Sequence, residues 1–127
     1  MKTVLVADDE LTIRKLYERE LTREGYNVVC ASNAKEAIER SQDSQPDLVV
    51  MDIRMPGMDG IEAMGRILEA QNEIPVVINT AYSSYKDSFL SWSADAYVTK
   101  SSDLGELKDT IRRILDKDTA LDNSAAE

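Results

Sequence analysis

Residues 48–52 read LVVMD, and the eight residues that follow read IRMPGMDG. Leu48 to Met51 are apolar at every position, which is the pattern of a strand covered on both faces of a parallel sheet. The run ends on a carboxylate, Asp52. This stretch therefore predicts a layered α/β fold with a charged group at the edge of its sheet.

Outward from this strand, short apolar runs alternate with longer segments whose apolar residues recur with a period near 3.6. Strands are expected at 3–7, 26–30, 47–51, 75–79 and 95–98, and amphipathic helices at 11–25, 33–42, 60–71, 84–92 and 103–117. Gly25 is expected to end the first helix, and Asp59 with Glu62 has the spacing of a capping box at the third. Five strand-helix repeats predict parallel strands joined by right-handed crossovers, with helices on both faces of the sheet.

The length of 127 residues fits one domain. We assign this domain to residues 1–117, and we interpret the unpatterned residues 118–127, DTALDNSAAE, as a flexible tail or the stub of a linker. No apolar run is long enough for a membrane span, and the apolar stretch of the N-terminus is too short for a signal peptide. A cytoplasmic location is therefore expected.

Charge and residue counts exclude several classes of function. Fifteen basic against twenty-four acidic residues leave a net charge of −9, which argues against a surface for nucleic acid. Cys30 is the single cysteine and is expected to be a buried, reduced thiol of the core. The chain has no histidine, so Ser-His-Asp and Cys-His nucleophiles, histidine zinc sites and a phosphohistidine donor are all excluded.

Polar groups stand at the carboxyl ends of four of the five expected strands. In an open parallel sheet these ends form the crevice that holds functional groups. The second strand ends in CASN and offers none, which agrees with the strand order 2-1-3-4-5, because that order places the second strand at an edge. The groups expected to converge in one cleft are Asp8, Asp9, Asp52, Thr80 and Lys100.

Three carboxylates in a partly desolvated cleft repel one another and require a cation. Oxygen ligands alone favour Mg²⁺ or another hard divalent ion such as Mn²⁺. With such an ion present, Asp52 can attack phosphorus, and the Lys100 ammonium and the Thr80 hydroxyl complement the charge on the transferred group. The expected product is an aspartyl phosphate.

Four motifs, taken together, carry a specific resemblance: ADDE at 7–10, MDIRMPGMDG at 51–60, NTA at 79–81 and YVTK at 97–100. Over about residues 2–117 the chain resembles the receiver domain of bacterial two-component response regulators, which has a chemotaxis-regulator-like, flavodoxin-type fold. The resemblance implies a signalling switch that takes part in its own phosphorylation and dephosphorylation, rather than an enzyme acting on other substrates.

The resemblance also implies roles for particular residues. Asp8, Asp9 and Asp52, with the main-chain carbonyl of Arg54, would hold Mg²⁺. Asp52 would accept the phosphoryl group from a sensor histidine kinase or a phosphotransfer protein. Lys100 would contact the phosphoryl oxygens and Asp52.

The resemblance implies that further residues make room for the phosphoryl group and respond to it. The small side chain of Ala81 would leave room for the phosphoryl group. Thr80 would shift toward that group, and Tyr97 would rotate into the vacated space, although a plain core role for Tyr97 is the alternative. Ser101 follows Lys100 where the family usually has a proline after a cis peptide bond, so the isomer of this bond stays open.

The output surface implied by the family comprises the helix expected at 84–92, the strand at 95–98 and the helix at 103–117. It would contact a downstream protein or an effector domain, and a homodimer is left open. Direct contact with nucleic acid or a membrane is not expected. The residues do not identify the cognate kinase or its signal.

Two other classes of protein share part of this set of residues. A haloacid dehalogenase-type phosphatase or phosphotransferase also uses an aspartate nucleophile and Mg²⁺, but it needs an acid two residues later, where this chain has Arg54. A flavodoxin needs a first loop rich in Ser, Thr and Gly to receive phosphate, and ADDE would repel it. Both are disfavoured.

Overall fold

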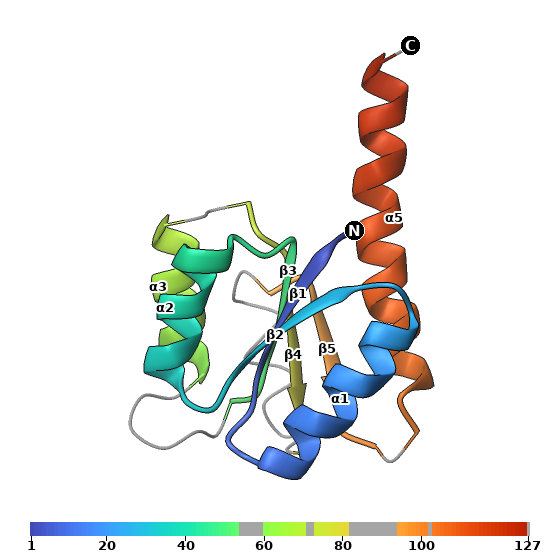
Figure 1. Ribbon diagram of the computed structural model, residues 1–127. Coiled ribbons are helices and arrows are strands. Elements are labelled where there is room, and N and C mark those ends of the chain that lie inside the picture. Colours follow the sequence, from blue (N-terminus) through green and yellow to red (C-terminus); the bar gives the residue numbers. More distant parts are fainter. Residues whose placement is uncertain (54–59, 71–72, 82–93, 102, 127) are drawn as a thin grey trace.

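The computed structural model describes residues 1–53, 60–70, 73–81, 94–101 and 103–126. Its centre is a five-stranded parallel sheet in the order β2-β1-β3-β4-β5 (Figure 1). The strands are β1 (Thr3–Ala7), β2 (Asn27–Ala31), β3 (Leu48–Met51), β4 (Val76–Thr80) and β5 (Ala96–Thr99). The predicted fold class and strand order are confirmed.

Four helices lie within the described residues: α1 (Leu11–Arg23), α2 (Ala34–Ser44), α3 (Gly60–Ala70) and α5 (Gly105–Ala126). The helix expected at 84–92 and the cap expected at Asp59 lie outside them. Helix α5 continues past residue 117, and its end projects beyond the rest of the chain (Figure 1). No glycine or proline follows Gly105, so nothing in residues 118–126 stops the helix. The division into a domain and a tail stays a prediction.

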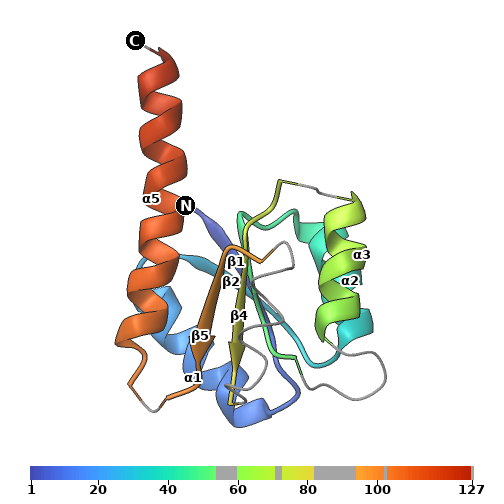
Figure 2. The ribbon, with the colours of Figure 1, turned by 180° about the vertical axis from the view of Figure 1, so that it is seen from behind.

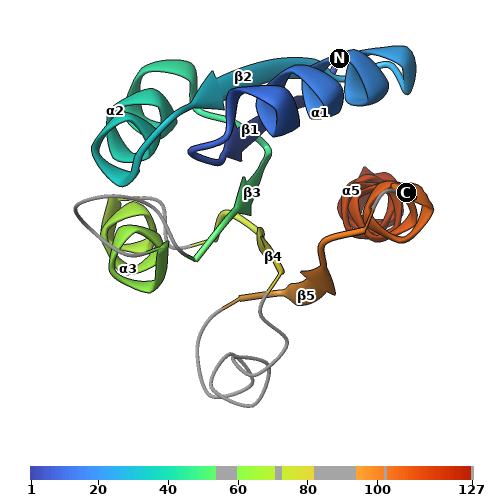
Figure 3. The ribbon, with the colours of Figure 1, turned by 90° about the horizontal axis from the view of Figure 1, so that it is seen from below.

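The helices cover the two faces of the sheet in pairs, as Figures 2 and 3 show from behind and from below. Buried residues of α2 and α3 pack on one face, and we call this cluster the α2–α3 core; among its members are Leu5, Val49, Met51, Met64 and Ile78. Residues of α1 and α5 pack on the other, the α1–α5 core, with Val6, Tyr17, Leu21, Val50, Val98 and Ile111 among its members. Because both faces are covered, β3 is apolar throughout, and β1 and β4 are apolar over most of their length.

Local signals place the first helices. Gly25 follows α1 with a φ of +96°, and its N–H donates to the carbonyl of Thr22, so the predicted left-handed terminator is confirmed. At α2 the Asn33 side chain accepts a hydrogen bond from the Glu36 N–H, and the Glu36 carboxylate accepts from the Ser32 N–H. This reciprocal cap fixes the entry of the chain into α2.

The single cysteine differs from its prediction. Cys30 is free, as expected, but it is only partly buried, and its thiol donates to the Glu18 carboxylate on α1. Strand β2 lies at one edge of the sheet, and Cys30 is one of three residues of this strand that are only partly buried. Burial, followed by the Glu18 carboxylate, raises the pKa of this thiol to about 11.

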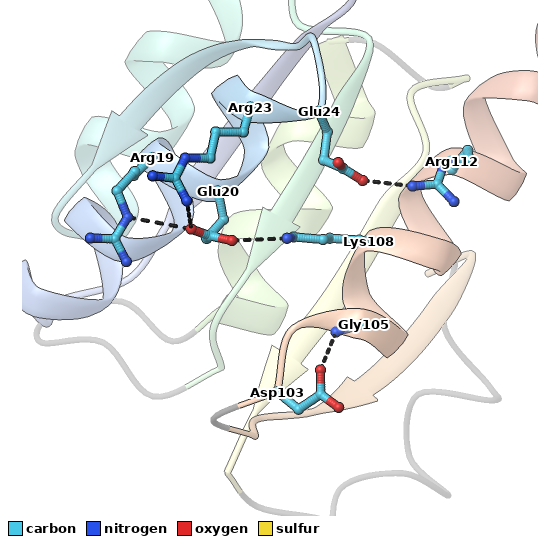
Figure 4. Close-up of polar contacts among 8 residues, drawn as sticks. All are labelled: Arg19, Glu20, Arg23, Glu24, Asp103, Gly105, Lys108 and Arg112. Atoms are coloured by element: carbon cyan, nitrogen blue, oxygen red, sulfur yellow. Dashed lines mark hydrogen bonds and ion pairs between the residues drawn. The ribbon is translucent and has the colours of Figure 1, made fainter.

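Ion pairs join α1 and the residue that follows it to α5 (Figure 4). The Lys108 ammonium lies 2.9 Å from Glu20, and the Arg112 guanidinium lies 2.6 Å from Glu24. Glu20 also contacts Arg19 and Arg23 of its own helix.

Among the residues described, no helix is long and apolar enough to cross a membrane.

Candidate functional site

The alternation of side chains along the strands aligns four polar residues on one face of the sheet. Residues two positions earlier on each strand, among them Val6, Val50, Val77 and Val98, face the α1–α5 core. Because a strand repeats every two residues, the next residues on that face continue the same rows past the apolar core. These residues are Asp8, Asp52, Asn79 and Lys100.

The Lys100 ammonium lies between two buried carboxylates at this edge. Its Nζ is 2.6 Å from Asp8 Oδ2 and 3.0 Å from Asp52 Oδ2. Asp8 is 2% exposed and Asp52 is 6% exposed. Backbone hydrogen bonds from Asp8 N to Ala31 O, from Asp52 N to Ala7 O and from Lys100 N to Thr80 O extend the strand ladder to these residues. The three charges therefore stand at hydrogen-bonded strand ends.

The electrostatics of Lys100 reflect these neighbours. Burial alone lowers the pKa of an ammonium, but hydrogen bonds to Asp8 and Asp52, and their charges, act in the opposite direction and outweigh burial. The pKa of Lys100 is therefore raised above its ordinary value, and the side chain is a permanent cation at neutral pH. A fixed positive charge beside Asp52 suits the binding of an anionic group there.

The loop after β1 gathers a second set of carboxylates. Oxygen atoms of Asp8, Asp9 and Glu10 lie within 4.8 Å of one another, and Asp9 and Glu10 are exposed. The Glu10 N–H donates to Asp8 Oδ1, and Arg14 donates to the carbonyl of Asp8, which holds the buried carboxylate in place. This all-oxygen donor set fits a hard divalent cation. Glu10 was not singled out from the sequence, although it lies within the ADDE motif.

The remaining predicted site residues are placed as follows. Thr80 is fully buried and continues the row of Val76 and Ile78, which face the α2–α3 core. Ala81 follows it and is exposed. Tyr97 is partly buried and packs against the α2–α3 core.

Two other sequence expectations concern the backbone. The carbonyl of Arg54 lies outside the described residues. In the segments that the structure covers no peptide bond is cis, so the bond from Lys100 to Ser101 is trans.

Sequence reasoning missed a polar pair next to the site. The Asn79 amide donates to the Tyr17 hydroxyl at 2.7 Å, and each residue is 2% exposed. The sequence carried one signal of this pair, because Asn79 interrupts the otherwise apolar strand VVINT before its last residue. A buried polar residue in a central strand calls for a partner.

A doubly wound α/β domain with two carboxylates and a lysine at the carboxyl edge of its sheet defines a class of domains that handle anionic groups at that edge. The comparison with protein families names the family: residues 4–112 match the response regulator receiver domain. The chain belongs to this family.

Relatives agree with this assignment. The chain is 36% identical over 114 residues to the regulatory protein AtoC of Escherichia coli, and 34% identical over 116 residues to the alkaline phosphatase synthesis transcriptional regulatory protein PhoP of Bacillus subtilis. These matches cover 88% and 90% of this chain but 25% and 48% of the relatives. The chain thus spans a quarter to a half of these relatives' lengths.

Solved structures are similar over nearly the whole chain. The response regulator TrrA of Thermotoga maritima, in complex with Mg²⁺-BeF, has 42% identity and a TM-score of 0.85, covering 89% of this chain and 98% of TrrA. TrrA in complex with the histidine kinase ThkA gives 42% identity and a TM-score of 0.83, covering 91% and 99%. The match to this family leaves the phosphatase and flavodoxin alternatives without support.

Proposed function

We propose that this chain is a phosphorylation-dependent signalling switch of a two-component system, in which Asp52 accepts a phosphoryl group from a sensor histidine kinase. The observation that carries the proposal is the Lys100 ammonium held between Asp52 and Asp8. Membership of the receiver family and the complex of the related TrrA with a histidine kinase support it.

The transfer makes a bond from an Asp52 carboxylate oxygen to phosphorus and breaks the bond from phosphorus to the leaving group. That group is an imidazole nitrogen of the kinase, which takes up a proton, or the acetate oxygen of acetyl phosphate, which leaves as acetate. Lys100 neutralises charge on the phosphoryl oxygens as they approach. Because Asp52 is buried, water has limited access to the acyl phosphate that results.

A divalent cation belongs to this proposal. Asp8, Asp9 and Asp52, with the carbonyl of Arg54, would hold Mg²⁺ or Mn²⁺, and the exposed Glu10 lies close enough to Asp8 and Asp9 to join them. When bound, the ion supplies positive charge that offsets repulsion between the carboxylates and the phosphoryl group. The Mg²⁺ in the related TrrA complex supports this choice of metal.

The response to phosphorylation would pass through β4 and β5. The added charge would draw Thr80 toward the phosphoryl group beside Ala81, and Tyr97 would follow into the space it leaves. The receiving surface would be formed by the helix expected at 84–92, by β5 and by α5. A downstream protein, an effector domain beyond α5 or a second copy of the chain would bind there, in the cytoplasm.

Phosphoryl transfer is tested by incubating the protein with acetyl phosphate and Mg²⁺ and measuring its intact mass. The wild type should gain one phosphoryl group, and Asp52→Asn should gain none. Asp43→Asn, at an exposed position of α2, is the matched control and should behave as the wild type. Absence of added mass in the wild type, or its persistence in Asp52→Asn, would refute the proposal.

The metal set is tested separately. Chelation with EDTA should stop phosphorylation, and Asp9→Asn should raise the Mg²⁺ concentration needed for half-maximal rate. A titration with Mn²⁺ in place of Mg²⁺ shows whether Mn²⁺ also supports phosphorylation. An unchanged Mg²⁺ requirement in Asp9→Asn would remove Asp9 from the ligand set.

A further inference from the structure

Tyr17 of α1 and Asn79 of β4 form a buried polar pair next to the phosphorylation site. The Asn79 Nδ2 donates to the Tyr17 hydroxyl at 2.7 Å, and both residues are 2% exposed. Below Asn79 on the same face of the sheet lie the apolar residues Val77 and Val98. A valine at position 79 would continue that face without burying an amide, and a buried amide is costly unless it is hydrogen-bonded.

The strand register places Asn79 directly beside Asp52. The ladder pairs Ala7 with Met51 and Met51 with Ile78. The next residue on each of these three strands therefore belongs to one row, which runs from Asp8 through Asp52 to Asn79. Neighbouring parallel strands lie about 4.8 Å apart, so the amide of Asn79 and the carboxylate of Asp52 are adjacent on the face toward α1.

The Lys100 side chain has to pass this amide. Strand β4 lies between β3 and β5, and Lys100 follows β5, yet its ammonium reaches Asp52 at the end of β3 and Asp8 at the end of β1. Lys100 and Asn79 lie on the same face, as the alternation of Val77 and Val98 shows. Asn79 is therefore a neutral donor on the face of the sheet that the Lys100 side chain crosses, and an amide N–H can bond to a carboxylate as Lys100 does.

The Tyr17 hydroxyl is the hydrogen-bond acceptor for this amide. Its oxygen accepts one of the two N–H groups of the Asn79 amide, and this hydrogen bond directs the side chain toward α1. Burial raises the pKa of the phenol, which keeps the pair uncharged at neutral pH. The charges of Lys100, Asp8 and Asp52 all act on the Tyr17 hydroxyl, which places it within electrostatic reach of the site.

We propose that Tyr17 is a positioning residue for the phosphorylation of Asp52: it holds the Asn79 amide away from the carboxylate, so that this amide does not compete there with Lys100. The inference rests on the proposed function of Asp52. It requires that loss of the Tyr17 hydroxyl slow the reaction only while the Asn79 amide is present.

The test measures the rate of phosphoryl incorporation from acetyl phosphate at saturating Mg²⁺ by intact mass. Tyr17→Phe, which removes one oxygen, should slow incorporation on the order of fivefold, because a small displacement of a reacting group reduces rate strongly. In the Asn79→Val background the same change should have no effect, so that the double variant reacts faster than Tyr17→Phe. Tyr26→Phe removes a hydroxyl from the same core at the far end of the sheet and should leave the rate unchanged.

The outcomes separate the two proposals. A wild-type rate in Tyr17→Phe, or slowing that persists in the Asn79→Val background, would overturn the positioning role while Asp52 phosphorylation stands. Slowing that matches a loss of folded protein, measured by circular dichroism in the same samples, would also overturn it. A wild-type protein that takes up no phosphoryl group would instead overturn the proposed function.

Discussion

At the scale of single residues, the charge balance at the sheet edge depends on one side chain. Lys100 is the cation that the structure places against two buried carboxylates, Asp8 and Asp52. Two buried negative charges this close to a shared partner repel each other when that partner is lost. Lys100 therefore stabilises the folded site in addition to its proposed role in phosphoryl transfer.

Lys100→Met should lower the free energy of unfolding by about 3 kcal/mol, because it removes the ammonium that lies between two buried carboxylates. Urea unfolding at pH 7 measures the change, and Mg²⁺ should restore part of it. Lys15→Met, at an exposed position of α1, is the control and should change stability little. Equal stability of Lys100→Met and the wild type would contradict the proposed charge balance.

The sign of the pH dependence follows from the raised pKa of Lys100. A raised folded-state pKa means that the stabilisation is complete below the unfolded value, about 10.4 for lysine, and is lost as pH rises through the folded value. Between pH 6 and 9 the Lys100 side chain stays protonated, so its titration should not change the difference in free energy of unfolding between the wild type and Lys100→Met. A decline should appear only in strongly alkaline solution.

The Cys30 thiol should react slowly with a disulfide reagent, although it is partly exposed. Its pKa is raised from 9.0 to about 11, so at pH 8 the thiolate fraction, and with it the rate of reaction with a disulfide reagent, should be about a hundredfold below that of an ordinary cysteine. Unfolding in urea should restore the ordinary rate. A Glu18→Gln variant should react faster than the wild type, and an equal rate would show that Glu18 does not hold the thiol.

At the scale of elements, capping decides where α2 begins. Asn33 Oδ1 accepts from the Glu36 N–H at 2.8 Å, so Asn33→Ala should lower the free energy of unfolding by about 1 kcal/mol. Lys35→Ala, at an exposed position of the same turn, should have little effect. Because α2 packs on the face opposite Asp52, phosphorylation by acetyl phosphate should be unchanged in Asn33→Ala. Comparable losses in both variants would argue against the cap.

At the scale of the whole molecule, α1 and α5 are joined by ion pairs between residues 88 positions apart in the chain. The pair of Arg112 with Glu24 is largely exposed, so its coupling should be below about 1 kcal/mol in a double-mutant cycle of Arg112→Gln and Glu24→Gln, and it should vanish in about 1 M NaCl. A larger coupling would mean that charges, and not the buried Ile111 and Leu115, hold α5 to the sheet.

Much of the architecture was predictable because each strand carries its own local signal. Leu48–Met51 is apolar on every position, and the structure starts β3 at Leu48 and ends it at Met51. The strand predicted at 3–7 coincides with β1, and the other four predictions differ from the structure by one residue at one or both ends, as at Thr80 and Thr99, since pairing in the ladder rather than side-chain type sets the last strand residue. The end of α5 was misplaced because no packing pattern marks its last residues.

The sequence alone determined that a carboxylate follows the buried run LVVM, that other polar groups follow three more strands, and that no histidine competes for their chemistry. These are local facts of residue type and spacing. Only the tertiary structure decided that Lys100 lies between Asp8 and Asp52, and that Asn79 meets Tyr17 across 62 residues. Such contacts depend on the register of separate strands and on the helix packed over them, and neither is encoded by neighbouring residues.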